Sequence, residues 1–263
     1  MALQPIFVRP LGLGTISTGN AATATPATHL AQTKHIGMVW GSSGNSNLWV
    51  RGDMGSAAAI DFVSLLSCNA QSGTTIRVRL GDTQAEVDGT APYDSTALPL
   101  ISPAVTRESG LYHSHLELPS LQTWRWWRID IGSHTGDFSA ATLVLGKRIT
   151  FTHFYDRGFE RGTEDLGSIE IGRWGVPDIT DGVIMRKLRF SLPWMTEAEY
   201  EDHVAPMVEA VGARTPIYCC FDPEATTRRQ AKTYFGWLKE PPFATGSAIP
   251  GKFSIDFEIS SQI

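Results

Sequence analysis

The sequence predicts a mostly β protein: a jelly-roll β-sandwich followed by a second β-sandwich or split-barrel domain that carries one docked α-helix. Three observations support this fold class. Short segments with strand-like alternation recur along the chain, and clusters of Gly, Asn, Asp and Ser separate most of them. No segment of the first half has a convincing helical period. The second half contains one stretch with clear helix start and stop signals.

Charge divides the chain near residue 150. The first 150 residues hold ten basic and ten acidic side chains, whereas the remaining residues hold twelve and seventeen. All of the net charge of −5 therefore lies in the shorter half. The first half is also rich in Gly, Ser and Thr, which is typical of turns and surface connections. We predict one domain over residues 1–150 and a second over residues 151–263.

Composition excludes several classes of protein. A 263-residue chain with 42% hydrophobic and 19% charged residues is typical of globular proteins. A pI near 5.8 argues against nucleic acid as a partner, because binding to phosphates favours a basic surface. No apolar run is long enough to insert into a membrane, and the first residues lack the apolar region of a signal peptide. Three cysteines are too few for a disulfide framework, so we expect Cys68, Cys219 and Cys220 to be reduced and buried.

Five segments of the first half are predicted strands: 59–67, 74–81, 111–118, 124–132 and 141–149. The fourth raises a question of its own. Alternation puts Trp127, Ile129 and Ile131 on one face, which indicates an ordinary core face. The other face carries Trp124, Trp126 and Arg128. These three residues are the candidates for ligand binding, and three explanations stay open for them: packing on a loop or a neighbouring domain, a contact with another subunit, or stacking on a sugar ring.

The second half mixes strands with one helix. Predicted strands cover 149–155, 167–174, 183–193, 216–221 and 252–260. Thr196 and Glu199 have the spacing of a capping box, and Gly212 suits the end of the helix. Pro206 should kink or split that helix. An apolar stripe at helical spacing is predicted to dock on the sheet, and it consists of Tyr200, Val204, Met207, Val208 and Val211.

No segment has the spacing of a catalytic motif. GSSGNS at 41–46 is not a nucleophile elbow, and GLGTISTG lacks the third glycine of a phosphate loop. His113, His115 and Glu117 would share one face of a strand, a geometry that zinc can use, but a solvated polar face explains them equally well. We therefore predict no catalytic residues, no metal and no cofactor. Paired carboxylates leave a glycoside hydrolase as a third-ranked alternative, with Asp61, Glu117, Asp130 and Asp165 available.

The segment RGFERGTEDLG at 157–167 is charged and punctuated by glycines, which is typical of a solvated loop. It is also our candidate for one side of a subunit contact. The residues available there for ion pairs with another copy are Arg157, Glu160, Arg161 and Glu164.

The stretch at 47–82 followed by WWRIDIG resembles the discoidin-like, galactose-binding-like jelly roll of many tailed-phage tail proteins. In that family a WxxxDxG strand leads to a strand that ends in a His-Asn or Cys-Asn pair. A later aromatic-Arg-Ile-x-Ile strand closes the sandwich. The matching positions here are Trp49, Asp53, Gly55, Asp61, Cys68, Asn69, Trp127, Arg128, Ile129 and Ile131.

The second half resembles the ring-forming β-sandwich-plus-helix domain of distal tail and baseplate proteins. The shared order is a long strand, a helix that opens with Thr-x-x-Glu, a glycine, a strand that ends in Asp-Pro, and a Tyr-Phe-Gly strand. Together the two resemblances cover most of residues 47–240.

The resemblance implies a non-enzymatic structural protein of the virion, located in a phage tail tip or baseplate and assembled in the host cytoplasm. It implies a symmetric ring, a trimer or a hexamer, that links the tail tube to adsorption or fiber proteins. The implied partners are copies of itself, the tail tube, the hub and the fibers, with a host glycan as a further candidate. The alternative function is a carbohydrate-binding module that recognises a host cell-surface glycan.

Overall fold

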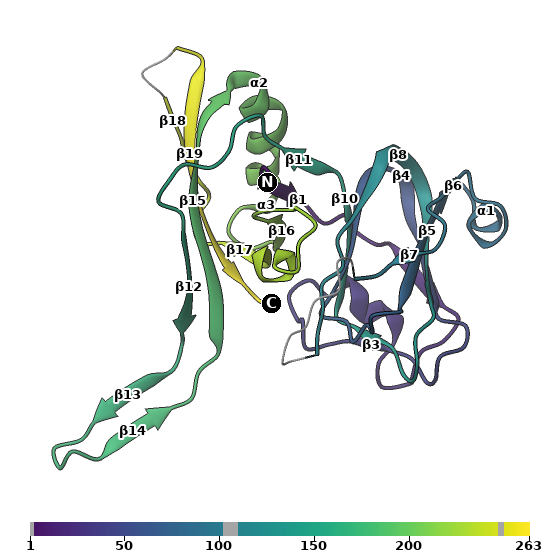
Figure 1. Ribbon diagram of the computed structural model, residues 1–263, viewed down its shortest axis with the longest axis horizontal. Coiled ribbons are helices and arrows are strands. Elements are labelled where there is room, and N and C mark those ends of the chain that lie inside the picture. The colour runs from purple at the N-terminus through teal and green to yellow at the C-terminus, as the bar shows by residue number, and fades with distance from the viewer. Residues whose placement is uncertain (1–2, 102–109, 247–249) are drawn as a thin grey trace.

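Two β-sheets account for most of the chain and lie side by side (Figure 1). The computed structural model describes residues 3–101, 110–246 and 250–263. One sheet is built from the first half of the chain, and the other from the second half together with two short strands of the first half, at residues 6–8 and 148–150. The predicted fold class, mostly β with sandwiched sheets and one docked helical segment, is confirmed.

The first sheet has seven strands in the order β10-β4-β8-β5-β6, with β2 paired to β4 and β7 paired to β5. The β4–β8 pairing shifts register twice, between Asp53 and Ala58 and between Ile60 and Phe62. Such bulges bend a strand, so this long pair curves round its core. The strands are β2 (Thr15–Thr18), β4 (Trp49–Leu66), β5 (Thr75–Gly81), β6 (Tyr93–Asp94), β7 (Leu98–Pro99), β8 (Leu116–Gly132) and β10 (Thr142–Gly146). Short elements flank them: β3 (Trp40–Gly41) paired with β9 (Ser139–Ala140), the 3-10 turn η1 (Ala27–Ala31) and the helix α1 (Gln84–Asp88).

The core of this first unit lies on the predicted face of β8. Trp127 and Ile129 are fully buried, and the indole N–H of Trp127 donates to the carbonyl oxygen of Leu13 at 3.1 Å. Gly52 on β4 lies directly opposite Trp127. A Cβ there would come within 2.5 Å of the indole ring, so only glycine leaves space for it.

The second sheet has eight strands in the order β11-β1-β16-β17-β19-β15-β12, with β18 paired to β19. The strands are β1 (Ile6–Val8), β11 (Arg148–Thr150), β12 (Glu160–Asp165), β15 (Ile184–Thr196), β16 (Ile217–Cys220), β17 (Thr233–Leu238), β18 (Ala244–Gly246) and β19 (Lys252–Ser261). A separate two-stranded ribbon joins β13 (Ser168–Ile171) and β14 (Pro177–Thr180). The 3-10 turn η3 (Arg229–Lys232) precedes β17.

The predicted helix is present and is interrupted before Pro206. It consists of α2 (Glu197–Glu199), a π-helical turn η2 (Tyr200–Val204) and α3 (Ala205–Val211). Both hydrogen bonds of the Thr196–Glu199 capping box form. The proline lacks an N–H and so cannot continue the regular ladder, which accounts for the break. Val204, Met207 and Val211 are buried in the core of the second sheet, as predicted.

The N-terminal strand belongs to the second sheet. β1 pairs antiparallel with β11 on one side and with β16 on the other. The side chains of β16 alternate between two cores: Cys219 lies in the core of the second sheet, whereas Cys220 and Tyr218 lie in a third core between the sheets. We keep the prediction that residues 1–150 and 151–263 form two domains. The strand β1 nevertheless belongs to the second sheet.

Several sequence expectations need correction. Only Tyr112 of the expected strand 111–118 forms a bridge before β8 begins at Leu116, because the Ser114 and His113 side chains accept hydrogen bonds from the Leu65 and Ser67 N–H groups of the segment opposite. The expected strand 149–155 is strand only to Thr150, because its partner β1 is three residues long. The expected loop 157–167 contains a strand, since the long edge of β15 offers β12 a partner.

Other features follow the sequence closely. Cys68, Cys219 and Cys220 are free and buried, as predicted. Among the residues that the structure describes, no helix has the length and apolar character needed to cross a membrane.

Replacing Phe7 tests the place of the N-terminal strand. Phe7 is fully buried, and its ring centroid lies 4.8 Å from that of Phe257 and 5.8 Å from that of Phe151. We expect Phe7→Ala to lower the free energy of unfolding of the second sheet by about 3–5 kcal/mol, through lost burial and a residual cavity. Denaturant unfolding followed by circular dichroism measures this. Phe243→Ala, at an exposed phenylalanine, is the control, and equal stability of the two variants would contradict the role of β1.

Candidate functional site

A β-arm with mostly exposed side chains projects from the second sheet. It comprises β12, the ribbon β13–β14 and the start of β15, and in Figure 1 its tip extends well away from both sheets. Antiparallel pairing in the ribbon places Ile169 opposite Ile179 and Ile171 opposite Pro177. Alternation puts all four of these side chains on one face. The other face carries Ser168, Glu170, Asp178 and Thr180.

Within the part of the chain that the structure describes, nothing covers the apolar face of the ribbon. Ile169 is 68% exposed, Ile171 75% and Ile179 60%. At the tip, Trp174 is 85% exposed, beside a turn in which Gly175 has a φ of 74°. Contiguous apolar surface of this kind marks an interaction site, and a two-stranded ribbon is at best marginally stable by itself.

The polar face of the ribbon also lacks internal compensation. Glu170 lies directly opposite Asp178, and like charges in that position repel. No ion pair joins either carboxylate to another residue that the structure describes. Where the arm meets the sheet, Gly167 and Gly182 cross closely: a Cβ on Gly182 would lie 1.9 Å from the backbone nitrogen of Gly167.

The predicted subunit-contact residues lie at the base of this arm. Glu164 pairs with Lys187 at 2.8 Å and Glu160 lies 3.9 Å from Arg189, both across the β12–β15 ladder. Arg161 donates to the hydroxyl of Tyr234 at 2.8 Å. Arg157 is exposed in the turn before β12. Three of the four candidates therefore hold β12 on its own sheet, and the uncovered surface lies further along the arm.

Sequence reasoning identified the charged base of the arm and missed its apolar face. The available signal was the alternation of Ile169 and Ile171, followed by Trp174, in a segment that also carries Leu166, Val176 and Ile179. Alternation alone predicts a half-buried strand, and only the tertiary structure leaves that face without a partner.

Of the ligand-binding candidates of β8, Trp124 and Trp126 are half-buried. Trp124 packs against the core of the first unit, and its indole N–H donates to Gln122 at 3.1 Å. It lies within β8 rather than at the start of a strand. Arg128 already has partners within the chain, because its guanidinium donates hydrogen bonds to Asp130 at 2.8 Å and to Asp88 at 2.7 Å.

Arg128 is one member of a network of ion pairs beside α1. Its guanidinium lies 4.5 Å from the ring centroid of Trp49, and that of Arg51 lies 4.9 Å from the same ring. Asp88, at the end of α1, pairs with both arginines. Burial by itself would raise the pKa of Asp88, but the hydrogen bonds from Arg51 and Arg128 bring that pKa below its usual value. The network uses these charges to attach α1 to the sheet.

The three residues considered as zinc ligands do not converge. The side chain of His115 is 3% exposed, with Nδ1 2.8 Å from the Tyr218 hydroxyl and Nε2 3.0 Å from the Glu117 carboxylate. His113 faces the end of β4 instead, where its Nδ1 accepts the Ser67 N–H. Within the described ranges, no cluster of three or more His, Cys, Asp or Glu side chains could hold a metal ion.

Two surface grooves complete the candidate sites. We call the first the edge groove, and its volume is about 290 Å³. It lies between β11 and the helical segment and is lined by Arg9, Leu11, Ala59, Lys147, Ile149, Asp202, His203, Pro206 and Met207.

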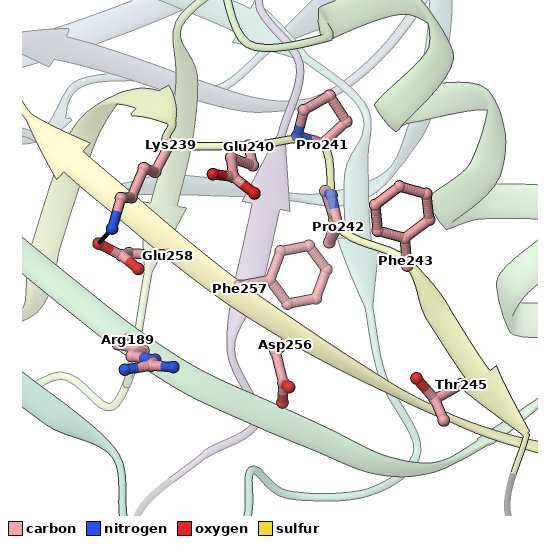
Figure 2. Close-up of a pocket in the computed structure, with 10 residues that line it drawn as sticks. All are labelled: Arg189, Lys239, Glu240, Pro241, Pro242, Phe243, Thr245, Asp256, Phe257 and Glu258. Atoms are coloured by element: carbon pink, nitrogen blue, oxygen red, sulfur yellow. Dashed lines mark ion pairs between the residues drawn. The ribbon is translucent and has the colours of Figure 1, made fainter.

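The second, the Phe243 groove, also has a volume of about 290 Å³. Figure 2 shows the segment from Pro241 to Phe243 facing charged side chains of β15 and β19 across it. Lys239 pairs there with Glu258 at 3.1 Å. Phe243 is 86% exposed.

No family model matches the chain, and no curated protein matches it. Solved structures similar to part of it include chitosan-binding module 1 of a chitosanase/glucanase from Paenibacillus sp. IK-5, at 14% identity and a TM-score of 0.36, over 52% of this chain and 98% of that chain. The lectin domain of lectinolysin complexed with Lewis B antigen is 12% identical over 51% of this chain and 92% of that chain, with a TM-score of 0.38. A Streptococcus pneumoniae fucose binding module is 11% identical over 52% of this chain and 95% of that chain, with a TM-score of 0.39. Likenesses this remote assign no function.

The His115 environment predicts a pH dependence of stability. Burial lowers the pKa of His115 below its ordinary 6.5, and the hydrogen bond from His115 lowers that of Glu117 below 4.5. The unfolded chain therefore binds more protons than the folded one as pH falls below 6.5, so acidification destabilises the fold. For one histidine the slope is at most about 1.4 kcal/mol per pH unit.

We expect His115→Gln to flatten the pH dependence of unfolding free energy between pH 7 and pH 5, measured by urea titration. His35→Gln, at an exposed position, controls for the loss of an imidazole. An unchanged slope in His115→Gln would contradict the assignment.

Proposed function

We propose that this protein is a non-enzymatic structural component that assembles with copies of itself into a symmetric ring. The observation that carries the proposal is the β-arm, whose ribbon exposes an apolar face far from either core. An arm of this kind gains stability only when another molecule covers it. Burying apolar surface contributes roughly 25 cal/mol per Å², so the ribbon and its partner surface can supply a substantial share of an assembly contact.

A ring follows from the shape of such a contact. An arm that leaves one side of a protomer and binds a different surface of the next makes a head-to-tail contact, and such contacts close when the rotation per subunit divides a full turn. The resemblance of the sequence to distal tail and baseplate proteins supports the finer proposal. In this finer proposal, the protein forms a trimeric or hexameric ring in a phage tail tip and binds the tail tube, hub and fiber proteins. The protein would then be part of the virion and assemble in the host cytoplasm.

Removing the apolar face of the ribbon tests this function. We expect Ile169→Asn with Ile179→Asn to abolish self-association, since the two side chains form one cross-strand pair on the apolar face. Both are exposed, so the free energy of unfolding should change by no more than about 0.5 kcal/mol per site. Light scattering over a concentration series and the copy number in assembled particles measure the outcome.

The matched control changes the opposite face of the ribbon at the adjacent cross-strand pair. Ser168→Asn with Thr180→Asn alters the neighbouring cross-strand pair without touching an apolar side chain, and it should assemble like the wild type. Assembly of the isoleucine variant to the wild-type copy number, or a wild-type copy number of one per particle, would contradict the proposal.

Glycan binding is the second candidate function, and the Phe243 groove favours it. The groove is lined by an exposed aromatic ring, Phe243, and by the carboxylates of Glu240 and Asp256, so it offers both a stacking surface and acceptors for sugar hydroxyl groups (Figure 2). On a glycan array, the full chain should then bind a saccharide, and Phe243→Ala should lose that binding while Leu121→Ala, at another exposed apolar residue, keeps it. An array without signal, or equal binding by both variants, would exclude this groove as a glycan site.

A further inference from the structure

The β-arm and the edge groove lie at opposite edges of one sheet. The strand order runs from β11 at one end to β12 at the other, with five strands between them. β12 and the start of β15 lead into the arm, whereas Ile149 of β11 lines the edge groove. Figure 1 shows the arm leaving the side of the sheet away from β11. A head-to-tail contact requires two complementary surfaces on different sides of a protomer, which is the arrangement that this sheet provides.

The edge groove has an apolar floor, and its lining carries two basic residues against one carboxylate, Asp202, together with His203. Leu11, Ile149 and Met207 contribute apolar atoms, and Arg9 and Lys147 are exposed at its border. Neither basic side chain forms an ion pair with another residue that the structure describes. The volume of about 290 Å³ is at the lower limit of small-molecule pockets, and it suits one or two large side chains.

The outer part of the arm has the complementary chemistry. Its largest apolar side chain is Trp174, at the tip, and tryptophan is among the residue types enriched at the side chains that dominate the binding energy of an interface. Acidic residues exceed basic ones in this segment, and attraction between such a segment and a basic border acts over about 10 Å at moderate salt. The acidic residues are Asp165, Glu170, Asp178 and Asp181, against the single basic residue Arg173.

We infer that the edge groove receives the arm tip of a neighbouring copy, with Trp174 as its anchor and Arg9 and Lys147 attracting the acidic arm. This inference rests on the proposed function and names the surface that completes the contact. The neighbour's ribbon would lie across the border between β11 and α3. Each protomer then donates one arm and accepts another.

Photo-crosslinking from the tip locates the contact directly. With benzoylphenylalanine at position 174 in the full-length protein, we expect crosslinked peptides that contain residues 147–149 or 202–207 of a second copy. Crosslinks to residues 168–180 would instead show two ribbons packed face to face. That result, crosslinks to any other segment, or no crosslinked dimer in an associating sample would overturn the inference.

Mixing two defective variants tests the direction of the contact. Trp174→Ser removes the anchor, and Ala59→Trp fills the groove, so each variant alone should be monomeric. Mixed together they should form a 1:1 heterodimer that grows no further, because only one intact arm and one intact groove remain. Association of the Ala59→Trp variant by itself, or no heterodimer in the mixture, would overturn the inference.

A charge reversal at the border of the edge groove gives a second test that does not depend on correct folding of the Ala59→Trp variant. Arg9→Glu with Lys147→Glu changes two exposed side chains and should weaken association by about tenfold, consistent with two exposed ion pairs. Lys34→Glu, at an exposed lysine of the first unit, should leave association unchanged. If the ribbon variant Ile169→Asn with Ile179→Asn abolishes assembly while the charge reversal does not weaken it, the arm functions in assembly but this groove is not its receptor. If the ribbon variant assembles normally, the proposed function itself fails.

Discussion

The pairing of β1 with β16 is the constraint on which the rest of the architecture depends. Three residues near the N-terminus enter the sheet of the second half, hydrogen-bonded on both sides, before the chain builds the first unit. The chain then returns beside its own start through β11. Both connections between the two sheets therefore lie at one edge, and the opposite edge is left to β12. The two faces of β16 contact different cores, so the packing of one sheet is coupled to that of the other.

This edge arrangement decides where function can lie. An edge strand presents unpaired backbone groups and is a natural place for intermolecular contact. Here β12 covers the edge of β15 with its own ion pairs, and the chain then continues outward as a ribbon. Among the described residues, no side chain of the ribbon belongs to any of the three cores, and its apolar side chains are largely exposed. A binding partner would account for these exposed apolar side chains. The edge groove, with its apolar floor, lies at the other edge of the same sheet.

In the first unit, unlike the ribbon, charged surface residues are paired with one another. Five of its charged side chains form a connected set beside Trp49, and each of the five has a partner in that set: Arg51, Arg79, Arg128, Asp88 and Asp130. Such a network fixes α1 and the outer face of the sheet, and it leaves Arg128 few free donors for a ligand. The tryptophans that make the segment QTWRWWRIDIG conspicuous are divided accordingly: Trp127 is core, and Trp124 and Trp126 are half-buried beside charged neighbours. Trp127 and Trp124 pack within the chain, and ligand binding by Trp124, Trp126 and Arg128 stays a prediction.

The sequence by itself determined the features that depend on neighbours along the chain. These include the fold class, the core face of β8, the capping box at Thr196, the break before Pro206 and the opposite orientations of Cys219 and Cys220. Each follows from local hydrogen bonding or from the two-residue period of a strand. The tertiary structure alone decided what depends on pairing between distant segments: the place of β1, the strand at 160–165, the separation of His113 from His115, and the exposure of Ile169 and Trp174. Alternation shows that a strand has an apolar face, but whether that face is covered depends on what lies across from it, and that is set by the order of strands in the sheet.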